Sequence, residues 1–219
     1  MLRKVVICQY RLLHYRVQLF ELLRQTCREA GLDFQLVHGQ PTRRELQKQD
    51  TGSLDWATVV HNRYIELGGK DILWQPFPQE HRDAGLVVVM QESRLLSNYP
   101  WLWWRAGTAA RMAYWGHGRN FQSSRPAGLR ERWKKTQIGL VDWWFAYTEL
   151  TKDILLKDGY PERRITVLDN AIDNAGFKQD LAAVSAVRIA ELRAGLGIDE
   201  SAPVGVFCGS LYPDKRLDF

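Results

Sequence analysis

The sequence predicts an α/β fold built on an open, doubly wound, mostly parallel sheet. Short apolar runs alternate with amphipathic helical stretches up to about residue 170, and this alternation is typical of strands joined by crossover helices. Two runs, KVVICQY near the start and AGLVVVMQ at residues 84–91, are almost continuously apolar. Strands that are buried on both faces of a parallel sheet have this composition.

The first unit of the pattern is a strand, a helix and a second strand. Residues 4–8 form the first strand, and RVQLFELLRQTCREAG follows as an amphipathic helix that ends at Gly31. One face of this helix carries Arg16, Phe20, Leu23 and Cys27. The segment LDFQLVHG is predicted to be the second strand.

The rest of the sheet is predicted from five further segments that hold strands, with three predicted helices between them. WATVVHNRYIEL holds strands, AGLVVVMQ is a buried strand, and Pro100 opens a helix over WLWWRAGTAARM. AYWGHG is a strand that runs into glycines, and GLRERWKKTQIGLVD is a basic amphipathic helix. WWFAYT is the next strand, Thr148 caps the helix ELTKDILLKDG, and RITVLDN is a final strand.

The pattern divides the chain into three parts. Residues 1–172 form the sheet domain, and residues 173–202 are a polar, Ala-rich connector with one helical stretch. Residues 203–219 read as a strand, a Gly turn and the start of a helix, which is how a new α/β unit opens. We therefore expect a second domain to begin here, with the chain being a fragment or a truncated product of its gene.

Composition limits the class of protein. No run approaches the ~20 apolar residues of a spanning helix, and the N-terminus lacks a secretory signal, so we expect a cytoplasmic protein. The three cysteines, Cys8, Cys27 and Cys208, are too widely spaced for a zinc site or a disulfide framework. We expect them to be free thiols in a reducing compartment.

The formal charge of +5 is concentrated in one region. Residues 91–135 contain nine Arg or Lys residues and two acids. A basic zone of this kind suits phosphates, anionic lipid or nucleic acid, and a solvated basic face is the alternative. No base-reading motif accompanies it, so no nucleic-acid partner is expected.

Two segments, in order and spacing, carry a family resemblance. They are YTELTKDILLKDGYPERRITVLDNAID and, about 30 residues on, GVFCGSLYPDKRLDF. Together they resemble retaining glycosyltransferases of the GT-B type, family 4, and HYRVQLFELL and AYWGHG resemble the acceptor-side domain of that family. The chain departs from the family pattern at Ser210, where the family has Arg, and at Arg216, where it has Gly.

The resemblance implies a Rossmann-like acceptor-side domain, then the start of a Rossmann-like domain that binds the nucleotide sugar. It implies that Lys215, with Gly209 and Ser210, contacts the donor diphosphate, whose charge grows as the sugar bond breaks. A solvated turn lysine is the alternative. It also implies transfer of a sugar, with retention, from a nucleotide diphosphate sugar to a glycan or lipid-linked acceptor, with no cofactor. No metal is implied, and the sequence has no Asp-x-Asp motif.

Three residues near predicted strand ends are further candidates. His117 lies between two glycines, and the resemblance implies that it acts beside the reacting sugar as the catalytic residue; a loop histidine is the alternative. Arg16, in the first turn of the first helix, is a candidate for binding a phosphate of the acceptor or the diphosphate of the donor. Tyr15 beside it is a weaker candidate for the same role. For these two, packing on the sheet edge is the alternative.

Tryptophans and basic residues suggest a membrane face. Trp101 and Trp104 share a helix face, and Arg130, Arg132, Lys134 and Lys135 follow on the basic helix. Trp with Arg is common in proteins that bind the membrane interface, although core packing also explains the tryptophans. The sequence therefore leaves open a peripheral location of the protein at the inner face of the membrane.

The sequence thus favours a glycosyltransferase fragment that is inactive alone. The rival is a non-catalytic Rossmann-like module that binds anionic membrane or nucleic acid through residues 91–135. The sequence identifies neither the sugar, the nucleotide base nor the acceptor.

Overall fold

The computed structural model describes residues 3–67, 70–104, 110–118, 136–169 and 172–209. The chain divides into two compact units, Met1–Asp173 and Asn174–Phe219, and each is described by itself. The first unit holds the sheet, and the second holds helices α6 (Asn174–Ala183) and α7 (Ala186–Gly195).

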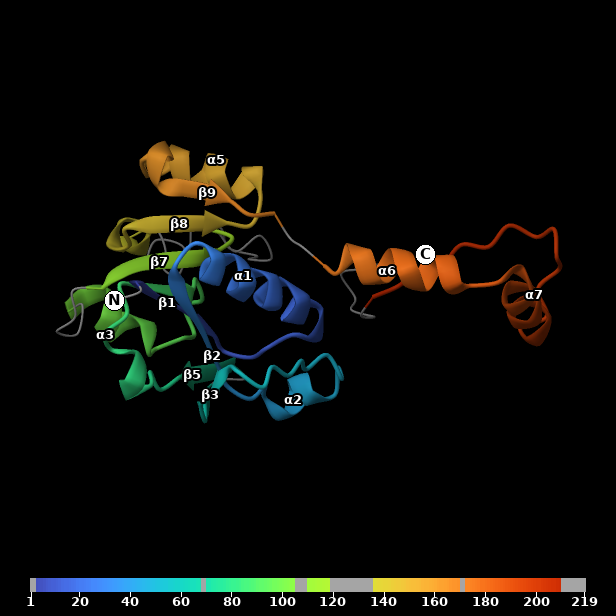
Figure 1. Cartoon of the computed structure of the whole chain (residues 1–219), viewed down its shortest axis with the longest axis horizontal. Helices are drawn as coiled ribbons and strands as arrows, with labels where there is room; N and C mark the ends of the chain where they lie inside the picture. The colour runs from blue at the N-terminus through green and yellow to red at the C-terminus, as the bar shows by residue number, and fades with distance from the viewer. Residues whose placement is uncertain (1–2, 68–69, 105–109, 119–135, 170–171, 210–219) are drawn as a thin grey trace. The chain divides into compact units, whose positions relative to one another are not determined.

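The first unit is built on a seven-stranded sheet in the order β3-β2-β1-β6-β7-β8-β9 (Figure 1). Every neighbouring pair in it is parallel. The strands are β1 (Arg3–Gln9), β2 (Leu32–His38), β3 (Thr58–Val59), β6 (Leu86–Met90), β7 (Arg111–Gly116), β8 (Trp143–Ala146) and β9 (Ile165–Val167). The order reverses at β1, so the prediction of a doubly wound sheet is confirmed. A separate antiparallel pair joins β4 (Arg63–Leu67) to β5 (Lys70–Trp74).

Helices pack on both faces of this sheet. On one face, Phe20 of α1 (Val17–Glu29) lies in a buried cluster with Ile7 and Trp115. On the other, Leu102 of α3 (Asn98–Trp104) and Leu155 of α5 (Glu149–Lys157) share a cluster with strand residues. Successive strand residues point to opposite faces, which is why the apolar runs of β1 and β6 feed both clusters.

Short helices complete the first unit. They are η1 (His14–Arg16), α2 (Arg43–Leu46), η2 (Gln79–His81), η4 (Ile138–Leu140) and η5 (Glu162–Arg164).

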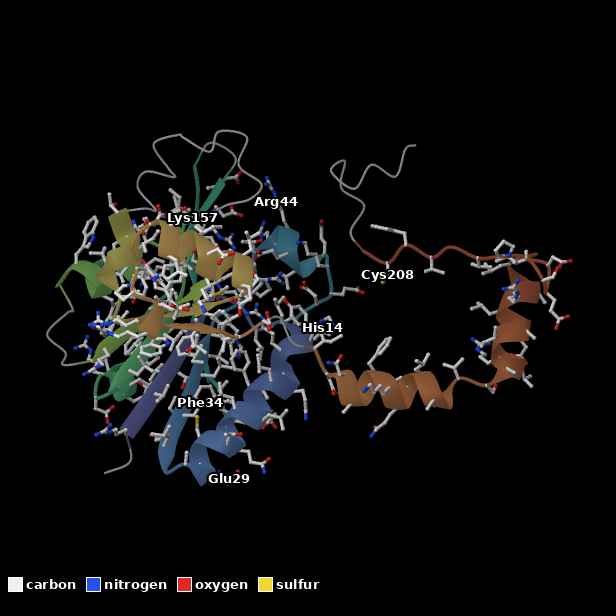
Figure 2. The ribbon with its side chains drawn as sticks, turned by 90° about the horizontal axis from the view of Figure 1, so that it is seen from above. His14, Glu29, Phe34, Arg44, Lys157 and Cys208 are labelled. Carbon is white, nitrogen blue, oxygen red and sulfur yellow. The ribbon has the colours of Figure 1, made fainter. Side chains whose placement is uncertain are left out.

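The packing of α1 follows the predicted helix face. Arg16 and Phe20 are buried, and Leu23 and Cys27 pack against the cluster that Phe20 joins. Figure 2 labels His14 and Glu29 near the two ends of this helix, with Phe34 of β2 close by. The rings of Phe20 and Phe34 stack with their centroids 6.5 Å apart, so aromatic packing joins the helix to the sheet.

Two helix ends have the local chemistry that the sequence predicts. The Thr148 side chain accepts a hydrogen bond from the Thr151 backbone N–H and caps α5. Gly31, after α1, has a φ of 69°, which is a left-handed conformation that glycine adopts at low cost.

The structure differs from the sequence prediction in several elements. Helix α3 begins at Asn98, so Pro100 is its third residue and not its first, and strand β5 was not predicted. Arg111 and Met112 belong to β7 rather than to a helix, because both pair with β6. The connector contains two helices rather than one; α6 lacks a clear apolar period, with every described side chain but one exposed. Residues 203–208 form no strand, since a strand needs a neighbour for its backbone groups. The assignment of residues 203–219 to a second domain stays a prediction.

We expect Thr148→Ala to lower the free energy of unfolding by about 1 kcal/mol, because the Thr151 N–H loses its acceptor at the start of α5. Chemical denaturation with circular dichroism measures this change. Thr148→Ser keeps the oxygen and is the matched control. If both substitutions destabilise the protein equally, the hydroxyl does not act as a cap.

Candidate functional site

The candidate site lies at the carboxyl ends of four neighbouring strands. Gln9 is the last residue of β1, and Gln91, His117 and Tyr147 directly follow β6, β7 and β8. These strands are consecutive in the sheet order, so the four side chains come from one edge. Ligands of open α/β sheets bind at this edge, near the point where strand order reverses.

Arg16 is the charged centre of this edge. It is 6% exposed, and its guanidinium donates to Gln9 Oε1 at 2.8 Å and to the Tyr147 hydroxyl. Its Cζ lies 5.0 Å from the centroid of the Trp115 ring. No carboxylate of the described residues forms an ion pair with it. Among the described residues, neutral oxygens and aromatic faces therefore hold this buried cation.

Tyr147 connects Arg16 to His117. Its hydroxyl accepts from Arg16, and its ring stacks on the imidazole of His117, with centroids 4.2 Å apart and an interplanar angle of 21°. Burial raises the pKa of Tyr147, against the opposing effect of the Arg16 charge. The phenol is therefore protonated at neutral pH and acts as a neutral acceptor for Arg16.

His117 sits in a turn that Gln91 holds through two hydrogen bonds to the backbone of Gly118. Gln91 Nε2 donates to the Gly118 carbonyl at 3.1 Å, and the Gly118 N–H donates to Gln91 Oε1 at 3.0 Å. Gly118 has a φ of 69°. A Cβ on Gly116 would lie 2.6 Å from Gln91 Cβ, so the first glycine makes room for the amide that fixes the turn. His117 itself is exposed.

A second polar network fixes the segment between β1 and Arg16. Arg11 donates to Asp50 Oδ1 at 2.5 Å, and the Tyr10 hydroxyl donates to Glu45 Oε1 at 2.9 Å. The guanidinium of Arg94 lies over the Tyr10 ring at 4.4 Å. Burial would raise the pKa of Glu45, but hydrogen bonds from Thr42 and Tyr10 and the charge of Arg94 outweigh it and lower that pKa. An ionised Glu45 thus anchors this segment at neutral pH.

The other predicted site residues are spread over the chain. Tyr15 is half-buried, with the Arg16 Cζ 5.7 Å from the centroid of its ring. Gly209 is exposed in the second unit. Ser210, Arg130, Arg132, Lys134, Lys135 and Lys215 lie outside the described residues, so their roles stay predictions.

The tryptophans of the predicted membrane face have different surroundings. Trp101 packs against the cluster under α3, with its ring centroid 4.5 Å from that of Phe77. This contact is core packing, which is the alternative that the sequence left open. The backbone of Trp104 ends α3, and its side chain lies outside the description. None of the helices in the described part of the chain has the length and apolar character that a bilayer crossing needs.

Sequence reasoning missed the roles of three residues of the site. The sequence pointed to the loops after Gln9, Gln91 and Tyr147 as places for a ligand, because each residue stands at or just after the end of a predicted strand, but it assigned no role to these side chains. Their position in the strand order was the available signal. Within the described residues, no three His, Cys, Asp or Glu side chains gather closely enough to hold a metal ion.

The sheet, its strand order and its carboxyl-edge site define a Rossmann-like domain of the GT-B type. In agreement with this class, the structure is similar to that of a glycosyltransferase from Rickettsia africae, with a TM-score of 0.51 and 13% sequence identity. The match covers 92% of this chain and 51% of that one. At this identity, the likeness shows the fold alone.

Two epimerases are more distantly similar. The UDP-GlcNAc 2-epimerase from Neisseria meningitidis matches with a TM-score of 0.47 and 11% sequence identity, over 90% of this chain and 54% of that one. The UDP-GlcNAc 2-epimerase from Methanocaldococcus jannaschii matches with a TM-score of 0.44 and 14% sequence identity, over 91% of this chain and 54% of that one. The chain thus spans about half the length of these solved structures. No protein-family model matches the sequence, and no curated protein does.

We expect Gly116→Ala to destabilise the first unit by about 1–3 kcal/mol, because the new methyl group overlaps Gln91 and displaces the amide from Gly118. Gly139→Ala is the matched control, since a Cβ there meets no atom within 4 Å. Urea unfolding followed by fluorescence compares the two variants. Equal stability of both would contradict the packing of Gln91 against Gly116.

We expect Tyr147→Phe to cost about 1–3 kcal/mol of unfolding free energy, because the buried Arg16 loses an acceptor. Tyr160→Phe is the control: the Tyr160 hydroxyl donates to the Val141 carbonyl at 3.0 Å, so only a neutral hydrogen bond is lost. Guanidinium denaturation measures both. A Tyr147 variant that costs no more than the Tyr160 variant would show that Arg16 does not depend on this hydroxyl.

Proposed function

We propose that this chain supplies the acceptor-side part of a retaining glycosyltransferase that uses a nucleotide diphosphate sugar and transfers to a glycan or lipid-linked acceptor. One observation carries the proposal: the Gln91-held turn presents His117 at the carboxyl edge of the sheet, linked through Tyr147 to the buried Arg16. The likeness in fold to the Rickettsia glycosyltransferase supports it.

The proposed chemistry follows from where charge develops. As the bond from the sugar to the diphosphate stretches, negative charge grows on the leaving group and positive charge on the sugar ring. Fixed dipoles and cations that meet this charge in a site shielded from water lower the barrier. We assign to His117 a hydrogen bond to a donor-sugar hydroxyl that strengthens in the transition state.

The other residues of the site have supporting roles in this proposal. Tyr147 sets the plane of the imidazole by stacking, and Arg16 with Gln9 holds Tyr147 in place. Arg16 also supplies positive potential for a phosphate. Lys215, with Gly209 and Ser210, is proposed to contact the donor diphosphate. Because side chains carry this charge, the proposal includes no metal ion or other cofactor.

We expect His117→Ala to lower kcat on the order of a hundredfold, which is the cost of losing one transition-state contact of ~3 kcal/mol. The measurement is sugar transfer by the complete gene product, with a panel of sugar nucleotides. Nucleotide affinity and melting temperature should stay near those of the wild type, because His117 is exposed.

His61→Ala is the matched control, since His61 is also an exposed histidine and lies among the lining residues of a different groove. Full kcat in His117→Ala, or activity lost only through unfolding, would refute the catalytic role. Absence of transfer from every sugar nucleotide by the wild-type product would refute the proposed function itself.

A further inference from the structure

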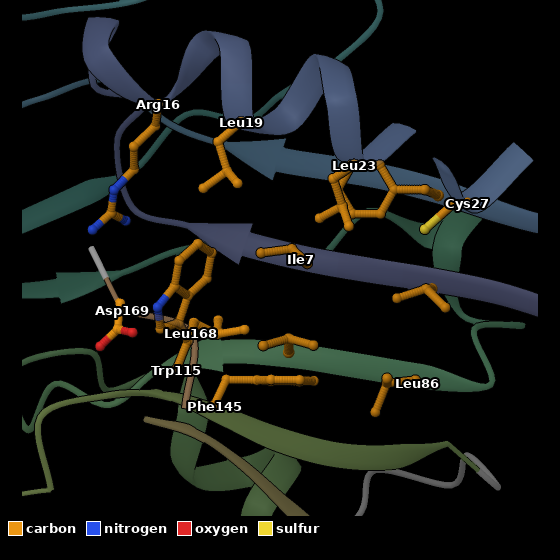
Figure 3. Close-up of a pocket in the computed structure, with 13 residues that line it drawn as sticks. Ile7, Arg16, Leu19, Leu23, Cys27, Leu86, Trp115, Phe145, Leu168 and Asp169 are labelled. Carbon is orange, nitrogen blue, oxygen red and sulfur yellow. The ribbon is translucent and has the colours of Figure 1, made fainter. Parts of the chain in front are cut away.

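An apolar pocket of about 210 Å³ runs between α1 and the sheet (Figure 3). Its walls come from α1 and from five strands, and they include Ile7, Leu19, Leu23, Phe34, Leu86 and Phe145. Cys27 lies at the far end of α1 and also lines the pocket. A cavity with such walls favours an apolar chain over a polar ligand.

One end of the pocket is polar, and it is the end at the carboxyl edge of the sheet. Figure 3 shows Arg16, the indole nitrogen of Trp115 and the Asp169 carboxylate together there, with the apolar side chains extending away from them. The three residues come from η1, from β7 and from the segment just after β9. The pocket therefore has an apolar body and a polar mouth.

The Trp115 N–H at this mouth lacks an acceptor. Trp115 is 5% exposed, and its Nε1 is buried without a hydrogen-bond partner in the described structure. An unsatisfied buried donor is costly, and a ligand oxygen would relieve this cost. The adjacent Arg16 is a buried cation without a carboxylate partner among the described residues, which calls for an anion at the same place.

Asp169 restricts the chemistry of that anion. It has a φ of 55°, an uncommon conformation for a residue other than glycine, and it makes no described ion pair with Arg16. A carboxylate head would accept from Arg16 and Trp115 but would repel Asp169. A phosphate monoester has a second pKa of about 6, so it is mostly a dianion at neutral pH, but beside the Asp169 carboxylate it can take up one proton from water and donate that hydroxyl to Asp169 while its other oxygens accept.

We propose that this pocket binds a single-chain alkyl or prenyl phosphate. The chain lies under α1, and the phosphate oxygens accept from Arg16 and the Trp115 indole. The inference rests on the proposed function only in taking this lipid phosphate for part of the acceptor. Binding needs no donor sugar, so the binding test and the transfer test can fail separately.

The test uses Cys27 as a reporter of occupancy. Wild-type protein is alkylated with iodoacetamide, with decyl phosphate present below its micelle concentration, and the modification of each cysteine is followed by peptide mass spectrometry. Decyl phosphate should slow alkylation of Cys27 at least tenfold at saturation. Inorganic phosphate should leave the Cys27 rate unchanged, and decanol should protect it at least tenfold more weakly than decyl phosphate. Cys208, which is exposed in the second unit, is the internal control.

Two kinds of variant distinguish the contribution of the polar mouth to binding from that of the apolar body. Trp115→Phe keeps the ring but removes the N–H, and should raise the Kd for decyl phosphate about tenfold. Leu19→Trp fills the pocket and should abolish protection. Leu22→Trp is the matched control, because Leu22 is 53% exposed on the same helix. Thermal unfolding checks that each variant is folded.

Three results would overturn the inference. The first is a Cys27 that does not react at all without ligand, which would mean that another part of the protein fills the pocket. The second is equal protection by decanol and decyl phosphate, which would remove the phosphate from the site. The third is equal loss of protection in the Leu19 and Leu22 variants, or unchanged binding in Trp115→Phe.

Discussion

The buried guanidinium of Arg16 is the constraint on which the arrangement of the site depends. A cation at 6% exposure must have its hydrogen-bond donors satisfied, and the fold meets this requirement with Gln9 from β1 and Tyr147 after β8. These two strands are separated in the sheet by β6 and β7. One side chain thus ties together both halves of the doubly wound sheet at its carboxyl edge, and the stacked His117 takes its orientation from the same contact.

Several polar groups of the site are held by partners that are distant in sequence. Gln91 holds the turn after β7, and the network of Tyr10, Glu45 and Arg94 holds the segment that leads to Arg16. Such preorganisation matters for transfer chemistry, since dipoles that are already aligned need no reorganisation when charge develops. The Trp115 N–H is unsatisfied beside the apolar pocket, so the proposed catalytic edge and the proposed lipid-binding pocket meet at this residue.

The sequence by itself determined several elements of the first unit. Continuous apolar runs predicted β1 and β6, and the Phe20 face predicted the packing of α1. Thr148 and Gly31 identified helix ends. The local sequence decides these features, so they can be predicted without knowing which distant residues pack against them. The same reasoning placed the candidate residues at the carboxyl edge, because that edge follows from a parallel sheet alone.

Only the tertiary structure decided what those residues contact. The partnership of Arg16 with Tyr147 joins positions 131 residues apart, and no local pattern encodes a pair so distant. Pairing with β6 drew Arg111 and Met112 into β7, whereas their own sequence favoured a helix. Residues 204–207 have strand composition but pair with no strand in the described part of the chain, and they form no strand there. In each case, the deciding free energy comes from a neighbour that is distant in sequence, through hydrogen bonds and burial that exist only in the folded chain.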